Sequence, residues 1–412
     1  MKLDPIINSL LETDAYKLNM QAIVAKKHNT DMARWAFRCR NDDVRFSSEM
    51  VAEIREQIDN FCTLKFEQED REWLSENFPW LGGAYINFLK YWKPDRSQIT
   101  INEPSHQKYN DCGLTIETQG TWLDTMMYEI PILAIVNEVY FAFKYSPNAL
   151  NLDFKTISRK RFKEILDGKY DIGTFSEFGM RRRYSAAMQD WLVKLLVDHK
   201  IPGFVGTSNV YLAKKYGIKA IGTQAHEFFM FYQGLHHLNP AYSNKFALED
   251  WSDFYGTKLG IALTDTIGTE VFLRDFGERL ATLFSGVRHD SGDPYAWGEK
   301  MLTHYRSLGI DPRTKTLLFS DSLNITKAAA LNAYFKDKAK VAFGIGTAFT
   351  CPFEPTEQHP DLYPLNIVMK MVNCNGSPVA KLSNTPSKVM CLDKEYISFL
   401  TKSIDWRIRH GL

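Results

Sequence analysis

The chain has no surplus of charge of either sign. Its 412 residues contain 50 Lys and Arg against 49 Asp and Glu, which gives a formal net charge of +1. Proteins that bind nucleic acid through its phosphates need a basic field, and this composition does not supply one. We therefore expect no nucleic-acid partner.

Paired cysteines and a long apolar run are also lacking. The six cysteines show no CxxC or zinc-ligand spacing, which favours a reduced protein with inert thiols. The first residues, Met-Lys-Leu-Asp-Pro, lack the apolar core of a signal peptide. The longest apolar stretch, near residues 130–143, is interrupted by Asn137 and Glu138 and is too short for a membrane span. These absences predict a cytoplasmic protein with no membrane partner.

Two common nucleotide-binding signatures are missing as well. Residues 168–170 read Gly-Lys-Tyr, without the Ser or Thr that ends a Walker A loop. Gly344-Ile345-Gly346-Thr347 follows a short apolar run, but Phe349 takes the place of the third glycine of a dinucleotide fingerprint. The loop still predicts phosphate binding of a generic kind, because backbone N–H groups beside glycine can face an anion. A tight structural turn is the alternative.

The pattern that is present, from about residue 170, is an alternation of short apolar runs with helical segments. Parallel strands wrapped by helices are the expected product, either as a barrel or as a doubly wound sheet. The expected strands are 171–175, 203–205, 218–221, 261–263, 283–287, 316–319 and 341–343. The expected helices are 183–199, 208–216, 225–235, 269–282, 294–308 and 323–336.

Polar side chains follow almost every one of these strands. In a barrel all these strand ends meet at one mouth, whereas an open sheet gathers its ligands at a single switch point. The residues concerned are Glu177, Thr207, Ser208, His226, Asp265, Thr266, Arg288, Asp290, Asp321, Gly344 and Gly346. Polar groups at seven strand ends favour the α/β barrel over the open sheet.

The first third of the chain mixes helical patterns with strands, and a chain of this length predicts more than one domain. Helices are expected at 48–61, 66–77 and 121–143, and strands at 33–40 and 98–118. Asn375-Gly376 between two β-like runs, 366–372 and 378–382, predicts a hairpin that returns to this sheet. We therefore expect a discontinuous α+β domain (1–145 plus 360–412) beside a barrel domain (146–359).

Residues 284–294 are the most informative stretch, because an apolar run ends there in Arg288, Asp290 and Asp293. An arginine can meet phosphate oxygens, while carboxylates take sugar hydroxyls or Mg²⁺. An ion-paired surface turn is the alternative, since Asp, Ser and Gly are ordinary turn residues.

Two further strand ends carry candidate chemistry. A neutral imidazole at His226 is a competent nucleophile or base, although a lone histidine is more often a hydrogen-bonded core residue. Phe178 and Arg181 could stack a flat ring and pair with its carboxylate, although a plain helix start is the alternative. We expect the following Arg182 and Arg183 to lie on a solvated face.

Two patterns near the amino terminus are weaker. Thr13 or Asp14 can cap a helix that contains Tyr16 and Lys17, which is a sufficient structural explanation. Arg38 and Arg40 alternate along a strand and therefore share one face, as a phosphate-binding pair would.

Taken together and in order, these segments resemble the nicotinate phosphoribosyltransferase family over nearly the whole chain. The resemblance implies a type II phosphoribosyltransferase fold, an irregular α/β barrel beside an α+β domain, acting as a homodimer with the active site at the subunit interface. It implies ATP-coupled transfer of phosphoribose from 5-phosphoribosyl 1-pyrophosphate (PRPP) to nicotinate, with Mg²⁺. The matching segments are Thr13–Lys17, Phe37–Arg40, Glu177–Arg183, Gly206–Asn209, Gly222–Glu227, Arg288–Pro294, Phe319–Asn324, Phe343–Thr350 and Lys381–Lys388.

The resemblance also implies a role for each matching residue. His226 matches a histidine that ATP phosphorylates, and Tyr16, lent by the partner subunit, matches one half of an aromatic sandwich completed by Phe178. Nicotinate would further contact Arg181 and Ser208, while Arg288 and Asp290 act at the reacting centre. PRPP and its phosphates would contact Lys17, Arg38, Arg40, Asp321, Gly344, Gly346, Thr347 and Lys381.

Ser208 bears on the choice of substrate. The related nicotinamide enzymes carry Asp at this position, and an Asp accepts from a carboxamide but repels a carboxylate. A serine can donate to a carboxylate, and mispairing a buried polar group costs about 1–3 kcal/mol. Nicotinate is thus favoured over nicotinamide, while a phosphoribosyltransferase that uses nicotinamide or quinolinate stays the alternative, separable by substrate competition. A barrel aldolase or isomerase is disfavoured because no expected strand ends in lysine, and a pure binding protein because so many charged groups meet at one mouth.

Overall fold

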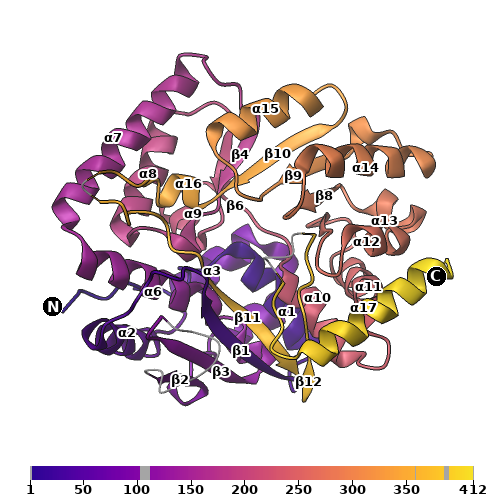
Figure 1. Cartoon of the computed structure of the whole chain (residues 1–412), viewed down its shortest axis with the longest axis horizontal. Coiled ribbons are helices and arrows are strands. Elements are labelled where there is room, and N and C mark those ends of the chain that lie inside the picture. The colour runs from indigo at the N-terminus through magenta and orange to yellow at the C-terminus, as the bar shows by residue number, and fades with distance from the viewer. Residues whose placement is uncertain (1, 103–111, 358, 385–388, 412) are drawn as a thin grey trace.

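The computed structural model describes residues 2–102, 112–357, 359–384 and 389–411. Parts of the expected strand segment 98–118 and of the segment Lys381–Lys388 lie outside these residues. The fold contains two sheets, one parallel and one antiparallel, with helices packed around both (Figure 1).

The parallel sheet has the strand order of a barrel that is open at one place. Its strands are β4 (Thr174–Glu177), β5 (Phe204–Thr207), β6 (Lys219–Ala220), β7 (Ile261–Leu263), β8 (Gly286–His289), β9 (Thr316–Phe319) and β10 (Lys340–Ile345). They are ordered β6-β5-β4-β10-β9-β8-β7, so neighbours follow chain order around a circle that opens between β6 and β7. The seven expected strands are confirmed, with ends shifted by at most three residues. The predicted irregular α/β barrel is this curled half-barrel.

The strands form where short apolar runs are buried on both faces. Phe175, Val287, Leu317, Phe319 and Phe343 are all almost fully buried. Helices α7 (Pro147–Leu166), α8 (Ala186–Asp198), α9 (Val210–Tyr216), α14 (Pro294–Ser307) and α15 (Ile325–Phe335) cover the outside of the sheet (Figure 1). The sequence pattern did not predict α7. Among the connections between the parallel strands, the longest runs from β6 to β7, across the opening, and contains α10 (His226–Leu235) and α11 (Ser243–Tyr255).

The antiparallel sheet joins distant parts of the chain. Its order is β12 (Ser377–Pro378), β11 (Ile367–Cys374), β1 (Met32–Cys39), β3 (Thr115–Thr121) and β2 (Ile99–Asn102). β11 pairs antiparallel with β1, which places Arg38 opposite Val368. This pairing confirms the predicted return of the hairpin to the first sheet. The proposed domain boundaries stay a prediction.

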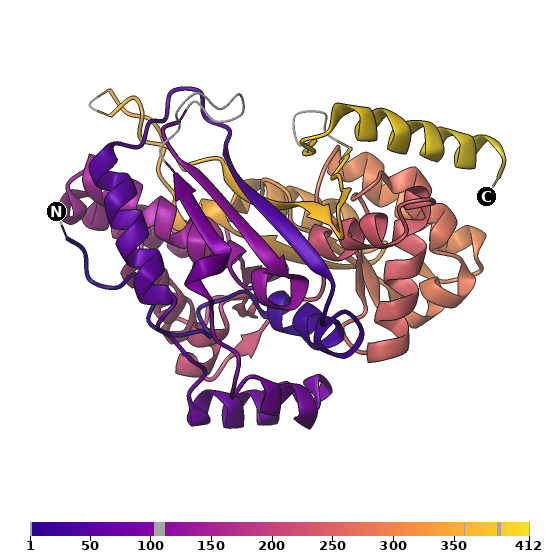
Figure 2. The ribbon, with the colours of Figure 1, turned by 90° about the horizontal axis from the view of Figure 1, so that it is seen from below.

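The carboxyl-terminal helix α17 (Lys394–Arg409) lies apart from this sheet, over the barrel side (Figure 2). Its residues Tyr396, Leu400 and Ile404 pack with Ile267 and Val271 in a separate apolar cluster. The sequence pattern did not predict α17.

Two expected helices are interrupted. The expected 121–143 segment divides into α5 (Trp122–Thr125) and α6 (Glu129–Lys144), and the expected 269–282 segment into α12 (Thr269–Asp275) and α13 (Glu278–Leu283). By length and composition alone the longer segment Trp122–Lys144 could cross a membrane. However, 83% of its most apolar window is buried inside the molecule, as in the core helix of a globular fold.

The remaining helices are short or lie near the amino terminus. The α-helices are α1 (Ala15–Lys27), α2 (Ser48–Phe61), α3 (Gln68–Asn77), α4 (Gly83–Phe88) and α16 (Thr347–Thr350). The 3-10 helices are η1 (Pro79–Leu81), η2 (Arg96–Gln98), η3 (Met180–Arg182), η4 (Pro240–Tyr242) and η5 (Pro312–Thr314).

Candidate active site

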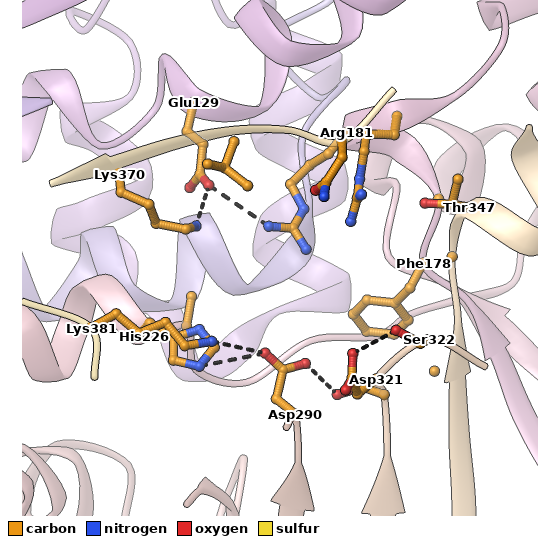
Figure 3. A pocket seen from close by; sticks show the side chains of 18 of the residues that line it. Glu129, Phe178, Arg181, His226, Asp290, Asp321, Ser322, Thr347, Lys370 and Lys381 are labelled. Carbon is orange, nitrogen blue, oxygen red and sulfur yellow. Dashed lines mark hydrogen bonds and ion pairs between the residues drawn. The ribbon is translucent and has the colours of Figure 1, made fainter. Parts of the chain in front are cut away.

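A cavity of about 1290 Å³ lies between the carboxyl ends of the parallel strands and one face of the antiparallel sheet (Figure 3). Thirteen of the fifteen predicted site residues line it, and the strand ends therefore converge as a barrel mouth requires. These residues are Tyr16, Arg38, Arg40, Phe178, Arg181, His226, Arg288, Asp290, Asp321, Gly344, Gly346, Thr347 and Lys381. Lys17 and Ser208 were predicted to belong to this site as well, but neither lines the cavity.

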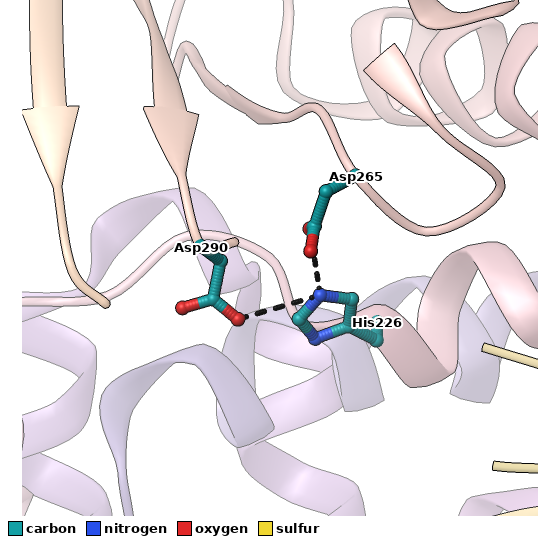
Figure 4. Close-up of side chains that lie close together, drawn as sticks. All are labelled: His226, Asp265 and Asp290. Atoms are coloured by element: carbon teal, nitrogen blue, oxygen red, sulfur yellow. Dashed lines mark hydrogen bonds and ion pairs between the residues drawn. The ribbon is translucent and has the colours of Figure 1, made fainter. Parts of the chain in front are cut away.

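His226, the first residue of α10, is held by two carboxylates (Figure 4). Its Nε2 lies 2.8 Å from Oδ1 of Asp265 and 3.4 Å from Oδ2 of Asp290. Because carboxylates accept and do not donate, Nε2 carries the proton and Nδ1 is left with the lone pair. Burial and the nearby Lys381 lower the pKa of His226 to about 4, although Asp265 acts in the opposite direction. The imidazole is therefore neutral near pH 7.

The carboxylates around His226 are ionised. Burial alone would raise the pKa of Asp265, but Lys381 and His226 outweigh it and hold that pKa well below its usual range. The same groups lower the pKa of Asp290 against its burial. The Lys381 ammonium lies 3.5 Å from Asp265 and 3.6 Å from Asp290 and thus balances part of their charge.

Asp265 is a residue of the candidate site to which the sequence argument gave no individual role. It follows β7 and was counted among the polar strand ends, but no spacing connects it to a histidine 39 positions earlier. Its second oxygen, Oδ2, accepts a 2.6 Å hydrogen bond from Ser291, which fixes the carboxylate toward the imidazole.

Two overlapping sets of side chains, both of which include Asp290, could hold a magnesium ion. Ligand atoms of His226, Asp265 and Asp290 lie within 4.8 Å of one another, but the ammonium of Lys381 already opposes these carboxylates. Mg²⁺ prefers oxygen ligands and usually binds through one or two carboxylates together with substrate phosphates. Asp290 and Asp321 both line the cavity and satisfy that preference.

The loop Gly344–Thr347 lies directly against Phe178. A Cβ added at Gly346 would come within 2.8 Å of the Phe178 carbonyl oxygen, so glycine permits this close approach. Gly346 therefore has the packing role that a tight structural turn would give it. Gly344, Gly346 and Thr347 also line the cavity, as a phosphate-binding loop would.

Tyr16 of this chain lines the cavity, whereas the resemblance implied a tyrosine lent by the partner subunit. The backbone of α1 is anchored within the chain, because Ala15 N donates to Ser208 O at 2.8 Å and Val210 N donates to Thr13 O at 3.0 Å. A Cβ at Gly222 would lie 2.7 Å from the Tyr16 nitrogen, so α1 packs closely against that glycine.

Lys17 and Ser208 are turned away from the cavity. The Lys17 amino group is fully buried, 2.8 Å from Glu129 and in contact with Glu227, which satisfies its charge inside the protein. The Ser208 hydroxyl donates to Asp14 at 2.5 Å and is fully buried. The predicted roles of Lys17 on phosphate and of Ser208 on nicotinate therefore lose their geometric basis.

The run Arg181–Arg183 divides between the cavity and the core. Arg182 lines the cavity, where burial and the neighbouring Arg181 and Arg40 lower its pKa to about 10. Arg183 is 1% exposed and donates to Glu12 at 2.8 Å. The expectation that both residues lie on a solvated face was wrong, because carboxylate and carbonyl partners from the amino-terminal segment enclose Arg183.

The curled half-barrel beside an antiparallel sheet belongs to the type II phosphoribosyltransferase class. Crystal structures of nicotinate phosphoribosyltransferases from Porphyromonas gingivalis and Vibrio cholerae match this fold with TM-scores of 0.88 and 0.89, at 32% and 35% identity. Each match covers 97% of this chain, and 100% and 94% of the respective crystal structure.

Sequence comparison identifies the family within that class. The family model described as nicotinate phosphoribosyltransferase (NAPRTase) matches residues 174–405, and that of its N-terminal domain matches residues 11–137. Proteins named nicotinate phosphoribosyltransferase from Escherichia fergusonii and Salmonella typhi are 40% and 41% identical over 97% of this chain and 96% of their own length. The chain belongs to the nicotinate phosphoribosyltransferase family.

Proposed function

We propose that this protein transfers the 5-phosphoribosyl group of PRPP to nicotinate, giving nicotinate mononucleotide and pyrophosphate for NAD synthesis, with coupled hydrolysis of ATP. One observation carries the proposal. A single cavity joins a neutral histidine held by two carboxylates, Asp265 and Asp290, to a ring-binding end formed by Tyr16, Phe178 and Arg181. The names of the relatives support the same substrate.

The transfer needs positioning and charge stabilisation rather than a protein base. The pyridine nitrogen already has a lone pair, so it attacks C1 of the ribose as the bond from C1 to the pyrophosphate oxygen breaks. Stacking between Tyr16 and Phe178 would align the ring, and Arg288 would stabilise charge on the departing pyrophosphate. The Arg288 side chain is oriented by a 2.9 Å hydrogen bond to the Gln224 carbonyl oxygen.

The ATP step would use the lone pair on Nδ1 of His226. That nitrogen attacks the γ-phosphorus, a nitrogen–phosphorus bond forms, and ADP leaves as the phosphorus–oxygen bond breaks. Asp265 keeps the proton on Nε2 and stabilises the ring as it gains positive charge. Water later cleaves the nitrogen–phosphorus bond and restores the neutral imidazole, which would help the product leave.

Three further parts of the proposal concern the setting of the enzyme. Mg²⁺, held by Asp290 and Asp321 together with substrate phosphates, would neutralise the polyphosphate.

A cytoplasmic location agrees with six free cysteines. A homodimer also remains part of the proposal, although the cavity contains Tyr16 of its own chain, and light scattering coupled to size-exclusion chromatography measures it.

A pyrophosphate-release assay tests the function. Purified protein with PRPP and Mg²⁺ should release pyrophosphate with nicotinate and far less with nicotinamide, and ATP should increase the rate. ADP should appear together with nicotinate mononucleotide. Equal use of nicotinamide, or release of pyrophosphate that does not depend on a pyridine, would overturn the proposal.

A further inference from the structure

Lys370 is a cavity cation to which neither the sequence argument nor the family resemblance gives a role. It lies on β11 opposite Ala36 of β1, two residues along the strands from the Arg38–Val368 pair. Lys370 shares a face of the sheet with Val368, two residues away on β11, and therefore with Arg38, which lies opposite Val368. Both Lys370 and Arg38 line the cavity. The side chain is only 14% exposed.

Glu129, the first residue of α6, brings Lys370 and Arg181 together. Its Oε1 lies 2.8 Å from Nζ of Lys370 and 3.7 Å from a terminal nitrogen of Arg181, and its Oε2 lies 2.8 Å from Nζ of Lys17. One fully buried carboxylate thus serves three cations, two of which line the cavity (Figure 3). Both cavity cations approach the same carboxylate oxygen, so Glu129 holds them side by side.

The charges in this cluster leave room for an anion. Burial lowers the pKa of Lys370, Glu129 acts to raise it, and the positive charges of Arg181 and Lys17 lower it further. In the described part of the chain, Glu129 is the only ion-pair partner that Lys370 and Arg181 have. A carboxylate brought by a ligand would supply the missing partner and form charge-assisted hydrogen bonds to both cations.

The cluster lies at the ring-binding end of the cavity. Glu129 holds Lys17, which directly follows Tyr16, and it holds Arg181, which lies three residues after Phe178. The same carboxylate therefore connects the two elements that carry the aromatic pair. Arg38 and Arg40, further along the sheet, are left for the phosphates of PRPP.

We propose that Lys370, fixed by Glu129 beside Arg181, binds the carboxylate of the pyridine substrate and so selects the acid over the amide. This proposal rests on the proposed function. It replaces Ser208, whose hydroxyl is committed to Asp14, as the source of substrate selectivity. Glu129 is a positioning residue, and Lys370 is a specificity-determining residue.

Steady-state kinetics of K370M test the proposal, with K336M, at an exposed lysine on the edge of α15, as the matched control. Loss of one charge-assisted contact should raise the KM for nicotinate roughly 10- to 100-fold. The KM for PRPP and the use of nicotinamide should stay unchanged, and K370R should recover part of the loss. E129Q, which keeps the shape of the side chain, should raise the KM for nicotinate in the same way.

Each outcome separates this proposal from the function on which it rests. If the unaltered protein does not convert nicotinate, the proposed function fails and this proposal fails with it. If the unaltered protein is active and K370M raises the KM for PRPP instead, Lys370 belongs to the phosphate site and the proposal is wrong. An unchanged KM for nicotinate in K370M, which a thermal melt must show to be folded, also overturns it.

Discussion

At the scale of single residues, the proposed reactivity of His226 depends on the carboxylate that holds its proton. Asp265 fixes Nε2 as the protonated nitrogen and is itself fixed by Ser291. In Asp265→Asn the amide group can donate to Nε2, which would stabilise the opposite tautomer and remove the lone pair from Nδ1. We expect phosphorylation of His226 by ATP to slow roughly 10²- to 10⁴-fold.

Incorporation of label from γ-³²P-ATP measures this effect, with Asp253→Asn, an exposed carboxylate on α11, as the control. PRPP binding and the melting temperature should remain close to those of the unaltered protein. Normal labelling in the Asp265 variant would show that the tautomer is not set by this carboxylate.

A second prediction at this scale concerns His226 itself. Replacing it with alanine should abolish ATP hydrolysis in step with product while a slow, uncoupled transfer to nicotinate continues, because the transfer requires no protein base. Chromatographic measurement of ADP and nicotinate mononucleotide in the same reaction gives the ratio directly. Continued one-to-one formation of both by the variant would exclude a phosphorylated His226.

The residue scale also shows where prediction from the sequence stops. His226, Arg288 and Asp290 could be found because each follows an apolar run whose end a barrel directs to its mouth. Arg182 and Arg183 could not be assigned, because three consecutive arginines give no local sign of direction. Arg183 is buried through Glu12, which is 171 residues away along the chain.

At the scale of elements, strands were more predictable than helix ends or helix partners. β7 and β9 have the predicted limits, because each is a short run of β-branched and apolar residues that ends where polar residues follow. α17 was missed because its apolar face is narrow and packs on distant residues such as Ile267 and Val271. Its position follows from tertiary contacts that no local pattern contains.

The junction of α6 and α8 gives a prediction about pH. Glu138 on α6 accepts a 2.9 Å hydrogen bond from the backbone of Ala186, the first residue of α8, and lies 3.7 Å from Arg183. Burial raises the pKa of Glu138 to about 7, although Arg183 opposes the shift. The folded state therefore keeps a proton that the unfolded chain loses above about pH 4.5. The stability from this group is complete below that pH and is lost as the pH rises through 7.

Glu138→Gln keeps an acceptor for Ala186 and removes the charge. Relative to the unaltered protein, the variant should gain on the order of 2 kcal/mol in its free energy of unfolding between pH 4.5 and pH 8. Urea unfolding across this range measures the difference, with the exposed Glu76→Gln on α3 as the control. Parallel pH profiles for the Glu138 variant and the unaltered protein would contradict the assignment.

At the scale of the whole molecule, the cavity is assembled from segments that the sequence places far apart. The alternation of strands and helices predicted the half-barrel, and Asn375-Gly376 predicted the hairpin that returns as β11. The resemblance implied that Tyr16 enters the cavity of the partner subunit, but the sequence alone could not test whether Tyr16 lines the cavity of its own chain or of a partner. That choice depends on α1 packing against Gly222 and on the buried contact of Lys17 with Glu227, both set by tertiary structure.

This placement of Tyr16 predicts that two inactive variants will not restore each other. If Tyr16 crossed to a partner subunit, mixed dimers of Tyr16→Ala and Arg288→Ala would contain one intact site and regain activity. Since the Asp14–Asn209 bridge and the Lys17 ion pairs anchor α1 within its own chain, each defect stays with the chain that carries it. Coexpressed variants with two different tags, purified as mixed species, should form nicotinate mononucleotide only at the average rate of the two variants alone. A rate well above that average would mean that the amino-terminal helix exchanges between subunits in solution.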